Sequence, residues 1–251
     1  MKKILFIIRK GFDADYLCSH LPRDNYDFYI VLESGRKARK KKLYRMFHRG
    51  RNVILTVMDL IALAAYDRIM TIRMKKLCRF GIEDEYAVAG NIADVNDEEI
   101  FNIAAHIRPD LICIYGTGIL KPSTIRGLSA EIFNIHSSVL PAYRNVHSDF
   151  WAYRNRDFDK IGITIFKLSS GVDTGDIAMQ AQNTLPVKSR LHEYKVWNLT
   201  HIIPLLNEFL SCYFDGKIVY FPQEEEKRSI GTTPTFEDLI GFWRDSEKDD
   251  K

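Results

Sequence analysis

Short apolar runs alternate along the chain with longer segments whose apolar residues recur at helical spacing. Continuous apolar runs are typical of strands buried on both faces, as in a parallel sheet. The pattern predicts an α/β fold with a Rossmann-like, mostly parallel sheet, whose ligands bind at the carboxyl ends of the strands. The predicted strands cover residues 4–8, 27–32, 111–115, 132–136 and 161–168.

Helical segments are expected between and after these strands. The first contains Tyr16, Leu17 and Leu21, and the others cover about residues 53–79, 97–107 and 189–214. We expect a main domain over residues 1–205 and a short C-terminal extension over residues 206–251. The extension is predicted to hold the end of the last helix, a short strand at 217–221 and an exposed acidic tail.

The composition is that of an ordinary globular protein, since 46% of the 251 residues are hydrophobic and 27% are charged. The net charge is +3, but residues 36–51 contain nine Lys or Arg and no acid, so the other residues sum to about −6. This distribution argues against a general polyanion binder, and we expect no nucleic-acid partner. The basic segment has several interpretations: it binds an anionic substrate, docks on a membrane, or only keeps a loop solvated.

Two apolar segments resemble export or membrane signals but fit neither. The run at residues 4–8 meets Arg9 at once, without the cleavage site of a secretory signal. The stretch at 53–66 contains Asp59 and is shorter than the ~20 residues that span a bilayer. We therefore expect a cytoplasmic protein without a transmembrane segment. Its cysteines lack the spacing of a metal site or redox pair and are expected to be reduced: Cys18, Cys78, Cys113 and Cys212.

Polar side chains end one of the predicted strands. Asn134 and His136 are two residues apart in the strand 132–136, so both project from the same face. An amide and an imidazole that converge there are able to stabilise an oxyanion and to move a proton. Polar residues also mark ordinary strand ends, so this pair alone does not decide the function.

Glycine-containing turns follow two other strands. In residues 171–176, Asp173 lies between two glycines, where it could reach a neighbouring imidazole or belong to a plain turn. Residues 116–118 supply two glycines of the dinucleotide fingerprint, but Lys121 stands where the third belongs. The chain also has no P-loop, so we predict neither kind of nucleotide site.

Three segments follow one another along the chain, at residues 134–144, 161–165 and 171–177. Their order and spacing resemble the folate-dependent formyltransferase family over about residues 95–185. The resemblance implies a formyltransferase-type fold and an enzyme that uses 10-formyltetrahydrofolate as formyl donor. It assigns the catalytic trio to Asn134, His136 and Asp173. An acceptor amine would attack the formyl carbon, with the amide and the protonated imidazole donating to the oxyanion and the carboxylate orienting the imidazole.

The resemblance also implies binding roles. In the family the pterin ring lies between two loops, which correspond here to Gly118, Ile119 and Leu120, and to Ser169, Ser170, Gly171 and Val172. The loop of Tyr143, Arg144 and Asn145 would contact the acceptor. The family often has glycine where Asn145 stands, and asparagine is a residue that tolerates positive φ. The anionic folate tail is one more candidate ligand for the basic segment.

Members of the family differ in their acceptors. Residues 9–13 lack the glycine-rich phosphate loop of glycinamide ribonucleotide formyltransferases. Too little chain follows Phe214 for the C-terminal barrel of methionyl-tRNA formyltransferases, and the first strand begins too early for the regulatory domain of formyltetrahydrofolate hydrolases. The chain is thus most similar to sugar N-formyltransferases. This similarity implies a nucleotide-linked amino sugar as acceptor, in surface glycan biosynthesis.

Other functions stay open at this point. The same trio would serve a formyltetrahydrofolate hydrolase, or a transferase acting on glycinamide ribonucleotide, methionyl-tRNA or another amine. A non-catalytic module that binds a nucleotide or a membrane surface is a further alternative. We expect no metal ion, and a homodimer is one candidate assembly.

Overall fold

A computed structural model gives the structure of the protein and describes residues 1–35, 52–78, 86–187, 189–223 and 229–248. The basic segment 36–51 lies outside the described residues, as does the predicted loop around Glu83, Asp84 and Glu85.

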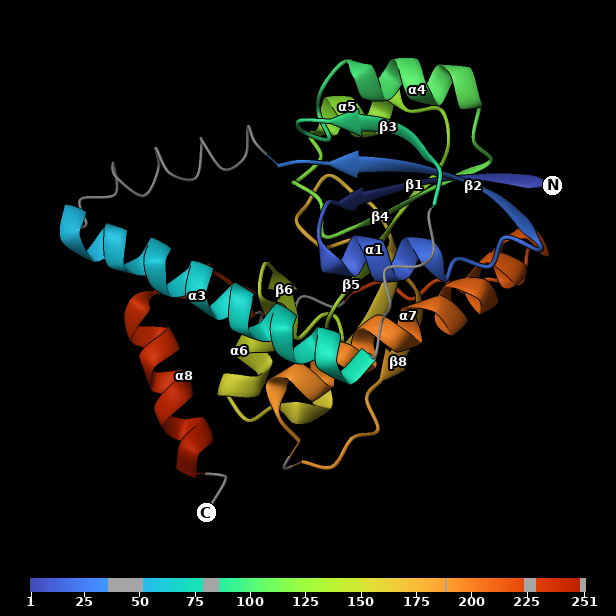
Figure 1. Cartoon of the computed structure of the whole chain (residues 1–251). Helices are drawn as coiled ribbons and strands as arrows, with labels where there is room; N and C mark the ends of the chain where they lie inside the picture. Colours follow the sequence, from blue (N-terminus) through green and yellow to red (C-terminus); the bar gives the residue numbers. More distant parts are fainter. Residues whose placement is uncertain (36–51, 79–85, 188, 224–228, 249–251) are drawn as a thin grey trace.

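A seven-stranded sheet forms the centre of the described fold, in the order β3-β2-β1-β4-β5-β7-β8 (Figure 1). Strands β3, β2, β1, β4 and β5 run parallel, and β7 and β8 are antiparallel to their neighbours. The mostly parallel α/β sheet is therefore confirmed. Its strands are β1 (Lys2–Arg9), β2 (Tyr26–Glu33), β3 (Val88–Ile92), β4 (Leu111–Tyr115), β5 (Ile132–His136), β7 (Gly162–Lys167) and β8 (Ile177–Gln182).

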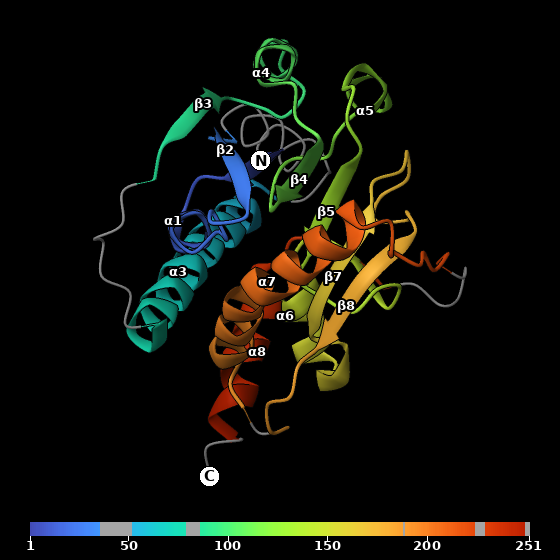
Figure 2. The ribbon, with the colours of Figure 1, turned by 90° about the vertical axis from the view of Figure 1, so that its right-hand side faces the viewer.

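Helices cover both faces of this sheet. Helices α4 (Glu99–Ile107) and α5 (Pro122–Gly127) lie on one face, and α1 (Phe12–Ser19) and α7 (Leu191–Phe214) lie on the other (Figure 2). Strand β1 shows why its sequence is continuously apolar. Its alternate residues enter two separate cores, one with Ile4, Phe6 and Ile8 and the other with Leu5 and Ile7.

A third cluster beside the sheet joins the start of α7, at Leu191, to three further helices: α3 (Val53–Cys78), α6 (Ser148–Arg154) and α8 (Phe236–Lys248). Tyr66, Phe150 and Phe242 pack there with ring centroids 5.6 to 5.9 Å apart. The Asp59 carboxylate on α3 accepts a hydrogen bond from the first backbone amide of α8, at 2.7 Å. The prediction of an exposed C-terminal tail was therefore wrong for α8, because its apolar face is buried against α3.

Other expectations need correction near the ends of elements. Helix α1 ends at Ser19, so Leu21 follows it rather than belonging to it. The predicted strand at 217–221 is only an isolated bridge between Phe221 and Ile177. A short strand does form further on, where β9 (Ser229–Gly231) pairs with β6 (Tyr143–Asn145). The predicted domain boundary after residue 205 falls inside α7, and the division into two domains stays a prediction.

The longest described helices are α3 and α7. Within the described part of the chain, neither they nor any other helix combines the length and hydropathy needed to cross a bilayer.

Candidate active site

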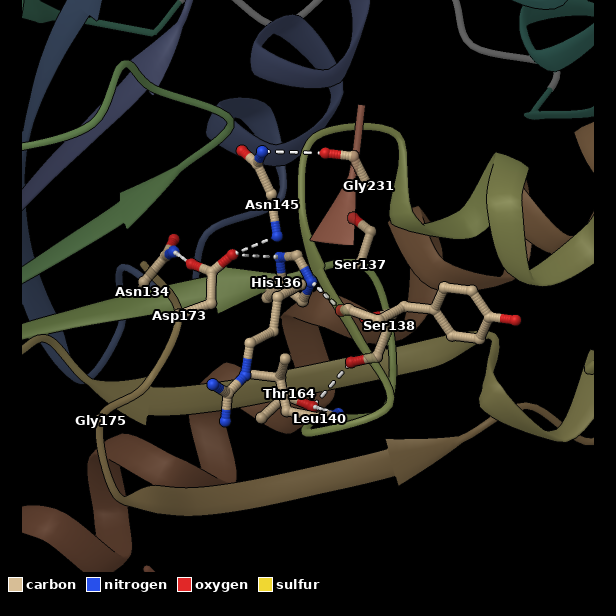
Figure 3. Close-up of polar contacts among 12 residues, drawn as sticks. Asn134, His136, Ser137, Ser138, Leu140, Asn145, Thr164, Asp173, Gly175 and Gly231 are labelled. Carbon is tan, nitrogen blue, oxygen red and sulfur yellow. Dashed lines mark hydrogen bonds and ion pairs between the residues drawn. The ribbon is translucent and has the colours of Figure 1, made fainter. Parts of the chain in front are cut away.

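A cavity of about 400 Å³ opens at the carboxyl ends of β4 and β5. Asn134 and His136 line it from β5, and Asp173 lines it from the loop between β7 and β8. The sheet therefore brings together the three side chains that the sequence singles out. Figure 3 shows them pointing toward one another.

The carboxylate of Asp173 is the centre of this trio. One oxygen accepts a hydrogen bond from the backbone amide of Asn145 at 2.6 Å and lies 3.9 Å from Nδ1 of His136. The other accepts a long hydrogen bond from the Asn134 side-chain amide at 3.4 Å. The carboxylate is thus fixed mainly by a backbone donor. Its distance from the imidazole is that of an ion pair, too long for a hydrogen bond.

The backbone carbonyl of Tyr143 holds the imidazole of His136. Nε2 lies 2.9 Å from this oxygen, which also accepts a hydrogen bond from Ser138 Oγ at 2.6 Å. A carbonyl oxygen only accepts, so Nε2 must carry a proton. Nδ1 is then the nitrogen that gains or loses a proton, and it faces Asp173. The predicted orienting role of Asp173 stays a prediction, and the structure adds the Tyr143 carbonyl, which makes the closer contact with the ring.

Thr164 supports the loop that carries this carbonyl. Its hydroxyl donates to the carbonyl of Ser138 at 2.7 Å and accepts from the amide of Leu140 at 3.1 Å and from Gln180 Nε2 at 2.9 Å. Thr164 is fully buried, and the peptide bond from Leu140 to Pro141 is cis. In the sequence, only the presence of a single polar residue in an apolar strand indicated this role.

Unusual backbone conformations bring the trio together. Asn145 has φ 71°, in the left-handed region that asparagine tolerates, and its side chain donates to the carbonyl of Gly231 at 2.8 Å. In the other loop, Asp173 itself adopts φ 49°. Gly175 is required for a different reason, since an added Cβ would collide with the carbonyl oxygen of Lys167.

The two loops predicted to bind the pterin face the same cavity. All seven residues line it: Gly118, Ile119, Leu120, Ser169, Ser170, Gly171 and Val172. Ile119 is 66% exposed and Val172 is 42% exposed, although both side chains are apolar. Two exposed apolar side chains on facing loops suit a flat ring placed between them.

The residues predicted to contact the acceptor do not all line the cavity. Asn145 lines the cavity, whereas Tyr143 and Arg144 are buried and do not belong to its described lining. The Tyr143 hydroxyl donates to Asp157, and the Arg144 guanidinium donates to Gln223 at 2.6 Å. Their side chains stabilise the loop, and a direct substrate contact by them stays a prediction.

Known proteins resemble this chain in sequence and in fold. Residues 83–196 match the family model described as formyl transferase. Over these residues the chain is similar to the formyl transferase family. A methionyl-tRNA formyltransferase from Kosmotoga olearia is 32% identical over 149 residues, which cover 58% of this chain and 47% of that enzyme. The chain spans about half or less of the length of the curated relatives it matches first.

Solved formyltransferases share the fold. A 4-N formyltransferase from Francisella tularensis matches with a TM-score of 0.57 at 14% identity, covering 97% of this chain and 87% of that one. A sugar 3N-formyl transferase solved with dTDP and 5-N-formyl-THF matches with a TM-score of 0.54 at 13% identity, covering 92% and 69%. At such identities the likeness shows the fold alone, and the formyltransferase-type fold is confirmed.

The cavity has a second polar wall that the sequence did not predict. It is formed by Asp13 from α1, Asp149 from α6, and Lys195 and Asn198 from α7. Lys195 Nζ lies 2.5 Å from a carboxylate oxygen of Asp149. Asn198 is 2% exposed, and its Oδ1 has no hydrogen-bond partner among the described residues. These residues lie far apart in the sequence, so no local pattern could have identified them.

The pKa values of the charged residues in this wall shift in different directions. Burial raises the pKa of Asp13 above the usual value of an aspartate. Burial also disfavours the charged forms of Asp149 and Lys195, but their mutual attraction outweighs it. The pKa of Asp149 is therefore lowered and that of Lys195 is raised. Among the described residues, no cluster of His, Cys, Asp or Glu is arranged to hold a metal ion.

Proposed function

We propose that the protein transfers a formyl group from 10-formyltetrahydrofolate to the amine of a nucleotide-linked amino sugar. The observation that carries the proposal is the convergence of Asn134, His136 and Asp173 in one cavity, at distances of 3.4 and 3.9 Å from the shared carboxylate. This arrangement places an amide donor, a titratable imidazole and a carboxylate around one point. Such a set suits acyl transfer to an amine.

The cavity fits the folate donor. The loops at 118–120 and 169–172 present backbone groups and two exposed apolar side chains on facing sides, and these would hold the pterin ring. When bound, 10-formyltetrahydrofolate supplies the activated formyl group. The trio lies in the same cavity, so the loops hold the donor beside the side chains that act on it.

The three side chains of the trio then have separate roles in the transfer. Among the described residues, the Asn134 amide makes only a long hydrogen bond, so its Nδ2 is available to donate to the developing oxyanion. His136, protonated at Nδ1, donates a second hydrogen bond, while the Tyr143 carbonyl keeps Nε2 in place. Asp173 balances the imidazolium charge from 3.9 Å and would accept the proton that the attacking amine loses. As the bond between the formyl carbon and N10 of the folate breaks, the Nδ1 proton of His136 would pass to N10, and Asp173 would return its proton to Nδ1, so that tetrahydrofolate leaves and both side chains regain their starting states.

A sugar acceptor is supported by the structural neighbours and by the second wall of the cavity. The matched sugar formyltransferase was solved with dTDP, and the 4-N formyltransferase covers nearly the whole of this chain. Asp13, Lys195 and Asn198 offer both donors and acceptors, which suits a hydroxylated acceptor. Methionyl-tRNA is a second candidate, because the curated relatives that match first are methionyl-tRNA formyltransferases.

Mass spectrometry of acceptor panels tests the proposal. The protein is incubated with 10-formyltetrahydrofolate and with nucleotide-linked amino sugars, methionyl-tRNA, or no amine. We expect one added formyl group on an amino sugar. His136→Asn should abolish it, while His106→Asn, which changes an exposed histidine on α4, should not. Formylation of the tRNA alone would transfer the assignment to the second candidate, and tetrahydrofolate release without amine would indicate a hydrolase.

A further inference from the structure

Helix α3 exposes an unusually apolar face to solvent. Ile54, Ile61 and Ile72 are 68%, 66% and 58% exposed. Other exposed apolar side chains of the helix are Val53, Val57, Ile69 and Leu77. Scattered apolar side chains are normal on a protein surface, but a continuous apolar patch marks an interaction site.

Five of these residues lie on one face of the helix, within about 60° of a common line: Ile54, Val57, Ile61, Ile69 and Ile72. At 3.6 residues per turn, Ile54 and Ile72 are separated by about five full turns and therefore lie on one line along the helix. Ile61 lies between them, close to the same line. The opposite side of the helix carries Tyr66 and Met70, which are buried in the cluster shared with α6 and α8. The exposed face is thus a second apolar side of a helix whose first apolar side is already packed in this cluster.

The charges on this face have one sign. Arg68 and Lys76 are exposed and lie within about 40° of the line of isoleucines, taking 100° per residue. The acids of the helix lie elsewhere: Asp59 is 5% exposed and bonds the start of α8, and Asp67 lies about 140° away. Residues 36–51, which precede the helix in the sequence, carry nine Lys or Arg and no acid. Their structure is outside the described residues, but their charge has the same sign.

We propose that α3 docks on the surface of a bilayer that contains anionic lipids. An exposed apolar stripe flanked by basic residues is the pattern of a helix that lies in the interface plane. Basic groups gain from the negative surface potential of anionic lipids, while the isoleucines enter the boundary of the acyl chains. The helix lies on the surface and does not cross the membrane, in keeping with its hydropathy.

The charges favour a lipid surface over a second copy of the chain. A symmetric dimer through α3 would place the same face of each protomer against the other. That face carries Arg68 and Lys76 and no acid, so the dimer would bury basic groups of both copies in one interface without an opposite charge to pair with them. Like charges at an interface oppose association. An anionic bilayer offers the opposite charge and an apolar layer below it.

Vesicle sedimentation tests the proposal with the full chain. Wild type is mixed with vesicles of phosphatidylcholine, or of phosphatidylcholine with phosphatidylglycerol. We expect binding to the anionic vesicles that weakens as salt rises. Ile54→Ser/Ile61→Ser should weaken binding by about tenfold or more, because it removes two inserted side chains. Arg68→Gln/Lys76→Gln should weaken binding to anionic vesicles and flatten the salt dependence.

The matched control is Val187→Ser/Val219→Ser, which removes two apolar side chains exposed at 67% and 65% elsewhere on the surface. It should bind like wild type, and circular dichroism should show that all variants are folded. Equal vesicle binding by wild type and the isoleucine variant would overturn the proposal. A wild-type dimer that becomes monomeric in that variant, without vesicle binding, would also overturn it and assign the face to a second copy. Formyl transfer in solution should be unchanged, so this test is independent of the proposed function.

Discussion

The backbone carbonyl of Tyr143 lies 2.9 Å from Nε2 of His136, seven residues earlier in the chain. The contact depends on a loop that leaves β5 and returns past the imidazole. Because this carbonyl keeps Nε2 as a hydrogen-bond donor, Nδ1 is the ring nitrogen left to take up and release a proton. A backbone atom therefore determines the tautomer of the central side chain, and a substitution at Tyr143 would leave that atom in place.

The first prediction concerns His136 itself. His136→Asn removes the titratable nitrogen that faces Asp173, so kcat for formyl transfer should fall by about 100-fold or more. The fold should survive, and the Km for the folate should change little because the binding loops are separate. Steady-state kinetics measures both constants. Turnover near the wild-type rate would remove His136 from the mechanism.

The second prediction separates the two roles of Asp173. Asp173→Asn keeps an oxygen that can accept from the Asn145 amide but removes the negative charge 3.9 Å from Nδ1. Without that charge the imidazolium loses its counter-ion and the attacking amine loses the group that accepts its proton, so kcat should fall by about 100-fold while the folate Km changes little. Steady-state kinetics measures both constants. A folate Km that rises as much as kcat falls would mean that Asp173 only holds the loop.

The third prediction concerns Glu33, which positions one of the cavity loops. Its fully buried carboxylate accepts from Arg9 at 2.9 Å, from the amide of Gly118 at 3.0 Å and from the amide of Val95 at 3.2 Å. Glu33→Ala should cost about 3–5 kcal/mol of unfolding free energy, because it leaves a partly buried guanidinium and two amides unpaired. Glu33→Gln should cost less and should raise the Km for the folate more than it lowers kcat.

A surface ion pair provides the control for Glu33. Asp159 and Lys160 lie 2.7 Å apart, and both side chains are largely exposed. Asp159→Asn should change the unfolding free energy by less than about 1 kcal/mol and leave the folate Km unaltered. Urea unfolding and folate titration give the two readouts. A folate Km that is unchanged in both Glu33 variants would show that the Gly118 loop does not depend on this carboxylate.

The sequence predicted what depends on local pattern. The apolar run of β1 indicated a strand buried on both faces, and the alternation in β5 placed Asn134 and His136 on one face; both hold in the structure. The order of the family segments added Asp173. Each of these features lies within one element or one loop, so the pattern of neighbouring residues is enough to predict it.

What the sequence missed depends on contacts between distant segments. The acidic composition after residue 223 suggested an exposed tail, but the apolar side of α8 is buried because α3 and α6 lie beside it. The second wall of the cavity joins Asp13 to Lys195 across most of the chain. The antiparallel direction of β7 likewise depends on how the chain returns after β5, and its sequence resembles that of a parallel strand.

The last prediction uses the opposite pKa shifts of Asp13 and Asp149. The pKa of Asp149 is lowered in the folded state because Lys195 outweighs the effect of burial. Its contribution to stability is therefore present above the unfolded value of about 3.9 and is lost as pH falls through the folded pKa. Asp149→Asn leaves the ammonium of Lys195 buried without its carboxylate. It should cost about 3–5 kcal/mol at pH 7.

Asp13 has the opposite sign, because burial raises its pKa in the folded state. Its charged form opposes folding at neutral pH, and this penalty is relieved as pH falls through the folded pKa toward the unfolded value of about 3.9. Asp13→Asn should therefore be more stable than wild type at pH 7, and the gain should shrink on acidification. Urea unfolding at pH 7, 5 and 4 measures both variants. If Asp13→Asn and Asp149→Asn were destabilised alike at pH 7, the two carboxylates would have equivalent roles beside Lys195, contrary to the structure.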